Sequence, residues 1–229
     1  MARSSTPSST LVFLVRHGQT PTTGQVLPGR APGLHLGDVG LAQAEAVAEN
    51  LSLWNDQQQQ TTKRSNSKAA GITAVYASPM ERTYETATPI ARAVGLRVRK
   101  NKGLLEADFG DWTGKKLSAL RKKPEWAAVQ NNPSGFRFPR GESFGEMQLR
   151  MVSTLEKLAS DHQGETIVAV SHADTIKAAA AHALGTHLDL FQRIVISPCS
   201  VTAIQYTAQG PLVLGVNTMT LPANRVGAS

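Results

Sequence analysis

Residues 11–20 read Leu-Val-Phe-Leu-Val-Arg-His-Gly-Gln-Thr, and this stretch decides the fold. Residues 11–15 form a short apolar run of the kind that a buried central strand uses. The run stops at Arg16-His17-Gly18, at the strand end where open α/β sheets place their ligand sites. Arginine offers a planar fork to phosphate oxygens, and histidine offers a nitrogen that attacks phosphorus or moves a proton. Glycine lets the backbone turn, so that both side chains can face one pocket.

The remaining pattern alternates strands with helices. Further strands are expected at residues 72–77, 97–100, 165–170, 195–205 and 212–216. Helices are expected at residues 38–54, 78–94, 114–130 (in two pieces, broken at Pro124), 143–162 and 173–184. This alternation predicts an α/β fold, a three-layer sandwich in which helices flank a mostly parallel central sheet.

We expect one domain over the whole chain, residues 1–229. Residues 56–70 are polar and of low complexity, which is typical of a surface loop. Residues 107–142 are expected to leave the sheet as a lid-like excursion over the site. Both termini are expected to be flexible.

The composition narrows the compartment and the classes of partner. Cys199 is the one cysteine, which excludes an internal disulfide and any CxxC metal or redox motif. No apolar run approaches the length of a membrane span, and the residues before Arg16 lack the apolar core of a signal peptide. We therefore expect a cytoplasmic protein with no membrane partner.

The net charge of +7 raises nucleic-acid binding as an alternative. The densest basic stretch comprises Lys115, Lys116, Arg121, Lys122 and Lys123. Aromatic residues make up only 5% of the chain and do not alternate with this stretch, so it lacks a stacking platform for bases. We expect a solvated basic face or pocket rim, with no nucleic-acid partner.

Three further motifs carry groups that suit phosphate chemistry. SPMERTYETA (residues 78–87) places Arg82 in the first turns of a helix. VSHA (residues 170–173) places His172 just before a helix N-terminus, which favours anions. LLEADFGDWTG (residues 104–114) sets carboxylates beside apolar residues, with Glu106 and Asp108 as rival acids. If these groups converge with Arg16 and His17, they make a phosphate trap with a nucleophile and a proton donor.

Taken in order, these four motifs resemble those of the histidine phosphatase superfamily, the phosphoglycerate-mutase-like proteins. The resemblance implies a phosphoglycerate-mutase-like fold and a reaction in which His17 becomes phosphohistidine. It implies that Arg16, Arg82 and His172 bind the transferring phosphoryl group. Glu106 would protonate the leaving oxygen and then activate water.

The resemblance also implies a set of substrate-binding residues. They are Gln19, Thr20, Thr23, Arg30, Glu142 and Ser143. Two departures from the family pattern lie near them: many relatives carry asparagine at the position of Thr23, and the loop after Arg30 is one residue longer and lacks the usual aspartate. The identity of the substrate therefore cannot be carried over from a relative.

The chemistry sets physical requirements on two of these groups. His17 must be neutral on its attacking nitrogen, with its other ring nitrogen held by a carbonyl or a similar acceptor. Glu106 should have a raised pKa, for which Phe109 and Trp112 are candidate sources of desolvation. Guanidinium groups can balance the phosphoryl charge, and the chain has no HxH, HExxH or Cys/His cluster, so no metal and no cofactor are expected.

The leading hypothesis is a metal-independent phosphomonoester hydrolase that acts on a small phosphorylated metabolite. The first alternative is a phosphoglycerate-mutase-type isomerase. Mutases carry a longer insertion after the acid than residues 107–140 provide. The second alternative is a non-catalytic module that binds anions or nucleic acid. Sugar phosphates, phosphoglycerate, α-ribazole phosphate and nucleotides all remain open as substrates, and the oligomeric state is not predicted.

Overall fold

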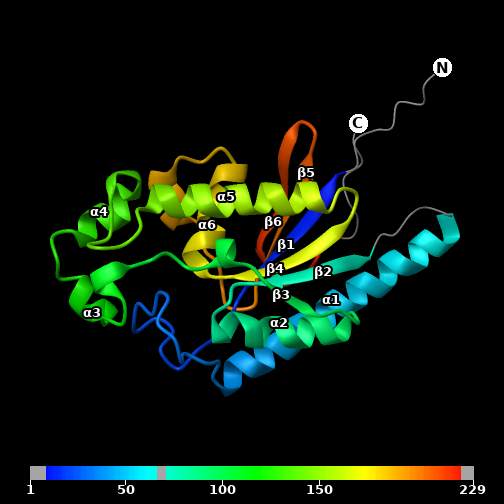
Figure 1. Cartoon of the computed structure of the whole chain (residues 1–229), viewed down its shortest axis with the longest axis horizontal. Helices are drawn as coiled ribbons and strands as arrows, with labels where there is room; N and C mark the ends of the chain where they lie inside the picture. Colours follow the sequence, from blue (N-terminus) through cyan, green and yellow to red (C-terminus); the bar gives the residue numbers. More distant parts are fainter. Residues whose placement is uncertain (1–8, 66–70, 223–229) are drawn as a thin grey trace.

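The computed structural model describes residues 9–65 and 71–222, and it shows a six-stranded sheet between two layers of helices (Figure 1). The strands are β1 (Thr10–Arg16), β2 (Ile72–Ala77), β3 (Val98–Lys100), β4 (Thr166–Ser171), β5 (Val201–Thr207) and β6 (Gly210–Thr218). Their order across the sheet is β3-β2-β4-β1-β5-β6. The first four strands in that order are parallel, whereas β5 pairs antiparallel with both β1 and β6. The expected α/β sandwich with a mostly parallel sheet is confirmed.

Strand β1 lies at the centre of the sheet and contributes side chains to both layers of the core. Side chains alternate across a strand, so Leu11, Phe13 and Val15 pack in one layer while Val12 and Leu14 pack in the other. The first layer contains α1 (Asp38–Ser65) and α2 (Glu81–Ala93), and the second contains α5 (Phe144–Asp161) and α6 (Ala173–Ala183) (Figure 1). A strand buried on both faces explains the uninterrupted apolar run at residues 11–15.

The prediction of a surface loop at residues 56–70 is wrong for residues 56–65, because these residues continue α1. Glutamine is a good helix former, so the polar run does not break the helix. The helix also has tertiary support here, because Asn55 is buried and its Oδ1 accepts a hydrogen bond of 2.8 Å from the backbone N–H of Ile72. Residues 66–70 and both chain ends (1–8 and 223–229) lie outside the described residues.

The strand expected from residue 195 begins later, at Val201. Pro198 has no N–H for a ladder, and Cys199 adopts a left-handed conformation with φ 54°. Residues 197–200 therefore turn, and the backbone N–H of Ser200 donates to the carbonyl of Ser197 at 3.1 Å.

Residues 107–142 lie outside the strands of the sheet and carry short helices. These are η2 (Gly110–Trp112), α3 (Leu117–Leu120), α4 (Trp126–Asn131) and η3 (Pro133–Gly135). Aromatic rings fasten this excursion to the layer of α5: the centroids of Trp112 and Phe138 are 5.5 Å apart, and those of Phe138 and Phe144 are 5.1 Å apart. The series of ring contacts continues to Phe191 of η4 (Leu188–Arg193), whose centroid lies 5.2 Å from that of Phe144. The excursion lies at one end of the sheet (Figure 1).

Helix α5 begins with a capping box. The hydroxyl of Ser143 accepts from the backbone N–H of Glu146 at 3.1 Å, and a carboxylate oxygen of Glu146 accepts from the N–H of Ser143 at 3.0 Å. Two otherwise unpaired donors of the first turn are satisfied in this way.

We expect Ser143→Ala to lower the free energy of unfolding by about 1 kcal/mol, because it removes the cap. Urea denaturation followed by circular dichroism measures this change. The matched control is Ser153→Ala, at an exposed position inside the same helix, where alanine should be neutral or slightly stabilising. Equal stabilities for the two variants would contradict the assignment of the cap.

Candidate active site

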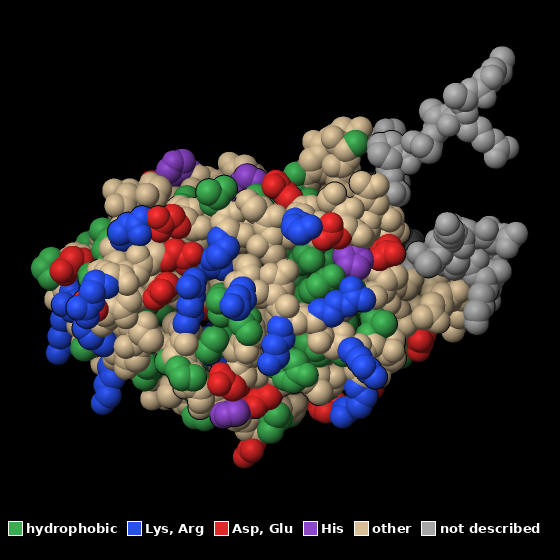
Figure 2. Space-filling view, in the orientation of Figure 1, with side chains coloured by type: hydrophobic (Ala, Val, Ile, Leu, Met, Phe, Trp, Pro, Cys, Tyr) green, Lys and Arg blue, Asp and Glu red, His purple; other side chains and the backbone are tan. Residues whose placement is uncertain are grey.

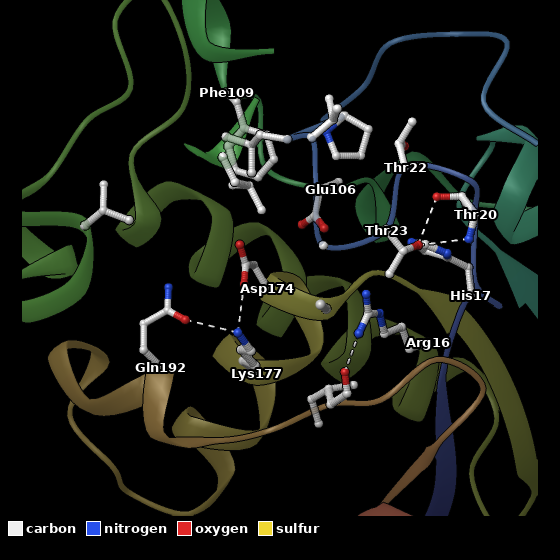
Figure 3. Close-up of a pocket in the computed structure, with 18 of the residues that line it drawn as sticks. Arg16, His17, Thr20, Thr22, Thr23, Glu106, Phe109, Asp174, Lys177 and Gln192 are labelled. Atoms are coloured by element: carbon white, nitrogen blue, oxygen red, sulfur yellow. Dashed lines mark hydrogen bonds and ion pairs between the residues drawn. The ribbon is translucent and has the colours of Figure 1, made fainter. Parts of the chain in front are cut away.

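A cavity of about 470 Å³ opens beside the carboxyl ends of β1 and β4 (Figure 3). Its charged and polar lining residues are Arg16, His17, Thr20, Thr22, Thr23, Arg82, Glu106, Arg121, Gln130, Asp174, Lys177 and Gln192. The excursion at residues 107–142 supplies much of the apolar wall. The sheet thus brings the ends of separate chain segments to one hollow, as expected for an open α/β fold.

His17 follows the last residue of β1 and is buried. Its Nδ1 lies 2.7 Å from the carbonyl oxygen of Gly18. A carbonyl only accepts, so Nδ1 carries the proton and Nε2 keeps its lone pair. The expectation that a carbonyl holds one ring nitrogen is confirmed. Burial, followed by the nearby charges of Arg82 and Arg16, lowers the pKa of His17 to about 3, so the ring is neutral at neutral pH.

The turn that carries His17 depends on a close approach of two glycines. A Cβ on Gly18 would lie 2.5 Å from the carbonyl oxygen of Gly40, and one on Gly40 would lie 2.0 Å from that of Gln19. The backbone N–H of Gly18 also donates to Oγ1 of Thr86 at 3.0 Å. The start of α1 and the middle of α2 therefore fix the backbone that holds the imidazole.

Arg82 is fully buried and only partly satisfied. Its Nη2 donates to the carbonyl oxygen of Gly29 at 2.8 Å. Among the described residues, neither Nε nor Nη1 has a hydrogen-bond partner. Burial lowers the pKa of Arg82, although Glu106 opposes this shift, and the guanidinium keeps its charge. A buried cation with unpaired donors is costly unless an anion completes it.

Arg16, at the end of β1, has the same character. Its Nη1 donates to the carbonyl oxygen of Ile196 at 2.6 Å, while the buried Nε has no partner among the described residues. Burial lowers its pKa, and Glu106 and Asp174 oppose the shift. Two incompletely paired guanidinium groups thus line the cavity with His17.

His172 is fully buried between Arg82 and Ser78. A guanidinium only donates, so Nδ1 of His172 accepts from Nη2 of Arg82 at 3.2 Å. Nε2 then carries the proton and donates to Oγ of Ser78 at 2.9 Å. Burial, followed by Arg82, holds the pKa of His172 well below its usual range. The ring lies 5.3 Å from that of His17, but both of its nitrogens contact protein, so phosphoryl binding by His172 stays a prediction.

Glu106 is 8% exposed and lines the same cavity. Burial, followed by the nearby charge of Asp174, raises the pKa of Glu106 to about 7, which confirms the expected direction. One carboxylate oxygen accepts from the backbone N–H of Ala107 at 3.0 Å. The rival acid Asp108 has a side chain that is 46% exposed and lies 3.7 Å from Arg30.

The structure separates the six predicted substrate-binding residues. Thr20 and Thr23 line the cavity, with their hydroxyls 3.0 Å apart. Gln19 is exposed, and its backbone N–H donates to Gln43. Ser143 caps α5.

Arg30 and Glu142 form an ion pair next to the backbone of Glu106. Nε of Arg30 donates to the backbone carbonyl of Glu106 at 2.7 Å, and its Nη2 pairs with Glu142 at 2.9 Å. Arg150, which the sequence analysis missed, donates to both oxygens of Glu142 and to the carbonyl of Leu105. These contacts hold the backbone around Glu106.

Five polar residues of the cavity were not predicted from the sequence: Thr22, Gln130, Asp174, Lys177 and Gln192. Asp174 and Lys177 had a usable signal, because they follow VSHA in the first turn of a helix at i, i+3 spacing. Gln192 belongs to η4, far along the chain, and no local pattern points to it.

The basic stretch is exposed, as expected, at Lys115, Lys116, Arg121, Lys122 and Lys123. Lys and Arg side chains gather over the end of the molecule that carries α3 and α4 (Figure 2). Arg121 also lines the cavity. The absence of a nucleic-acid partner stays a prediction.

In residues 9–65 and 71–222, no helix has both the length and the apolar character to cross a membrane. Within the same residues, no group of three or more His, Cys, Asp or Glu side chains is placed to hold a metal ion.

Comparison with known sequences gives a consistent family. Residues 12–219 match the family model described as "Histidine phosphatase superfamily (branch 1)". A bifunctional protein of Mycobacterium tuberculosis is 31% identical over 204 residues, which cover 88% of this chain and 51% of that protein. The chain thus spans about half the length of the first of its curated relatives. Phosphoserine phosphatase 1 of Hydrogenobacter thermophilus is 28% identical over 211 residues, which cover 90% of this chain and 91% of that protein.

Solved structures share the fold. The mycobacterial glucosyl-3-phosphoglycerate phosphatase has a TM-score of 0.75 at 21% identity, covering 91% of this chain and 99% of that chain. A phosphoserine phosphatase from Entamoeba histolytica has a TM-score of 0.75 at 23% identity, covering 92% of this chain and 98% of that chain. The expected phosphoglycerate-mutase-like fold is confirmed.

We expect inorganic phosphate to raise the melting temperature of the protein, and Arg82→Leu to abolish this rise. An anion completes the unpaired donors of Arg82, and a ligand at 100 times its Kd stabilises the native state by about 2.7 kcal/mol. Differential scanning calorimetry across a phosphate titration measures the effect. Arg92→Leu, at an exposed arginine of α2 paired with Glu45, is the matched control and should keep the full response. An undiminished response in Arg82→Leu would place the anion elsewhere.

Proposed function

Because the chain belongs to the histidine phosphatase superfamily, we propose that it is a phosphomonoester hydrolase that acts on a small phosphorylated metabolite through a phosphohistidine, without a metal. The observation that carries the proposal is the neutral ring of His17, whose Nε2 keeps its lone pair in a cavity shared with two incompletely paired guanidinium groups. That combination suits phosphoryl transfer, which needs a positioned nucleophile and compensation of charge on the oxygens.

In the first step, Nε2 of His17 attacks phosphorus and the bond to the ester oxygen breaks. Arg16 and Arg82 hold the non-bridging oxygens and balance their charge. Glu106, in its protonated form, gives its proton to the departing alkoxide. The products of this step are the free alcohol, a phosphohistidine and the carboxylate of Glu106.

In the second step, water attacks the phosphohistidine and the P–N bond breaks. The carboxylate of Glu106 takes a proton from the attacking water, and inorganic phosphate forms. His17 returns to its neutral form, with Nδ1 still donating to Gly18. A pKa of about 7 for Glu106 suits both halves of the cycle, because the protonated and the deprotonated forms are both populated at neutral pH.

Hydrolysis is favoured over isomerisation by the relatives. Phosphatases are named among both the similar sequences and the similar structures, although a phosphoglycerate mutase-like protein is among them too. The mutase alternative and the non-catalytic alternative are outcomes of the test below. The cytoplasmic location stays a prediction.

We expect the protein to release phosphate from 4-nitrophenyl phosphate and to form an acid-labile, alkali-stable phosphoprotein when substrate is quenched early. His17→Ala should lose both activities, because it removes the nucleophile. A phosphate-release screen over phosphorylated metabolites then identifies the substrate. His182→Ala, an exposed histidine of α6, should retain full activity.

Two other outcomes would replace the proposal. Isomerisation of 3-phosphoglycerate with no release of free phosphate would establish a mutase. Salt-dependent binding of RNA with no hydrolysis of any ester would establish a binding module.

We expect Glu106→Gln to separate the two steps. With 4-nitrophenyl phosphate, the leaving group needs little help from an acid, so the variant should show a burst of about one nitrophenolate per protein followed by slow turnover. With an alkyl phosphate, the variant should lose activity by about 10²- to 10⁴-fold, because proton transfer to the alkoxide is lost.

The pH dependence of the wild type provides a second readout. Glu106 is protonated below about pH 7, so hydrolysis of the alkyl phosphate should fall as the pH rises through this value. Glu106→Gln should lack this limb. A burst with the same size and rate for the alkyl ester in both proteins would show that another group is the acid.

A further inference from the structure

The cavity is larger than a phosphoryl group requires. Its volume of about 470 Å³ lies within the range of sites that enclose a drug-sized ligand. His17, Thr20 and Thr23 lie on one side of it, whereas Asp174, Lys177 and Gln192 lie on the opposite side (Figure 3). The side away from His17 is therefore available to the alcohol part of a substrate.

Apolar side chains from two segments line much of this space. Leu117, Trp126 and Val129 come from the excursion, and Ile194 and Val195 come from the chain just after η4. Val195 is 65% exposed and lies at this lining. Apolar surface of this kind gains free energy when an apolar or aromatic ligand covers it.

A cluster of three polar residues, Lys177, Asp174 and Gln192, lies beside this apolar lining. Nζ of Lys177 donates to Oδ1 of Asp174 at 3.2 Å and to Oε1 of Gln192 at 3.0 Å (Figure 3). The side chains of Lys177 and Asp174 are largely buried, with 17% and 20% exposed. Nζ also lies 5.9 Å from the ring centroid of Phe191.

The geometry makes this group rich in donors. An ammonium has three hydrogens, and two of them are used by Asp174 and Gln192. The ammonium group of Lys177 can only donate, so the oxygen of the Gln192 amide must face it. The NH₂ of the same amide is then left to donate elsewhere. Asp174 balances the charge of Lys177, so the remaining ammonium hydrogen and the amide NH₂ of Gln192 are the donors that can bind a ligand. Arg121 adds a further positive charge to the lining of the same cavity.

We propose that Lys177 and Gln192 form a distal subsite, which binds an anionic hydrogen-bond acceptor at the far end of a substrate whose body is apolar or aromatic. The proposal rests on the proposed function, since the phosphoryl end of the same molecule lies at His17. A carboxylate is the simplest such acceptor. The subsite thus selects phosphomonoesters of hydroxy acids with an apolar body over esters of small polar alcohols.

The test uses two matched series of synthetic aryl phosphates. One series carries a carboxylate on the ring, directly or after one or two methylenes, and the other carries methyl, ethyl or propyl at the same position. We expect kcat/KM of the wild type to favour at least one carboxylate ester by about tenfold or more, the size expected of a hydrogen bond to a charged group. Lys177→Met and Gln192→Leu should each bring this ratio towards one.

The ratio is measured within each variant, so loss of folded protein and changes at Glu106 affect both series and cancel. Lys157→Met, an exposed lysine of α5 paired with Asp161, is the matched control and should keep the wild-type ratio. A wild-type ratio near one for all ring positions, or a ratio unchanged in both variants, would overturn the subsite. Failure to hydrolyse any ester, including the uncharged series, would instead overturn the proposed function.

Discussion

The site depends on a cation that the protein buries without fully pairing it. Arg82 is 0% exposed, and its Nη2 donates to Gly29 and His172. Its Nε and Nη1 have no partner among the described residues. Burying an unpaired charge costs several kcal/mol, which the fold must offset elsewhere. The same charge helps to keep both imidazoles neutral, because it disfavours a second cation nearby. Burial is the larger cause of both pKa shifts, and this guanidinium adds to it.

The sheet makes this arrangement possible. Strands β1 and β4 are parallel neighbours, with Arg16 in register with Ser171, so His17 and His172 follow adjacent strand ends although they lie far apart in the sequence. The contact between Gly18 and Gly40 ties the first of these ends to α1. Rigid elements thus hold both histidines. The proposed distal subsite draws Lys177 from α6 and Gln192 from η4, and its apolar wall comes from the excursion and from residues 194–195. Under the proposed function, the apolar wall of the cavity can change without altering Arg16, His17 or Arg82.

Much of the fold could be predicted from the sequence, because its strongest patterns are local. The apolar run before Arg16, the motif of SPMERTYETA and the capping box at Ser143 each act within a few residues. The errors arise where tertiary contacts decide. Residues 56–65 look like a loop by composition, but the helix continues past the buried Asn55. Arg30 and Glu142 carry charges that suit a substrate, yet they meet each other behind Glu106, which no spacing in the sequence reveals.

In the proposed reaction, the incomplete pairing of Arg16 and Arg82 also affects the release of the product. Orthophosphate, the product, presents the same oxygens to these guanidinium groups as the ester does, and it no longer has an alcohol part to be strained or expelled. The cavity therefore holds its own product by the contacts that it uses to recognise its substrate. Under the proposed function, orthophosphate in the surroundings competes with the substrate for the same guanidinium groups, so product inhibition follows from the recognition of the substrate itself.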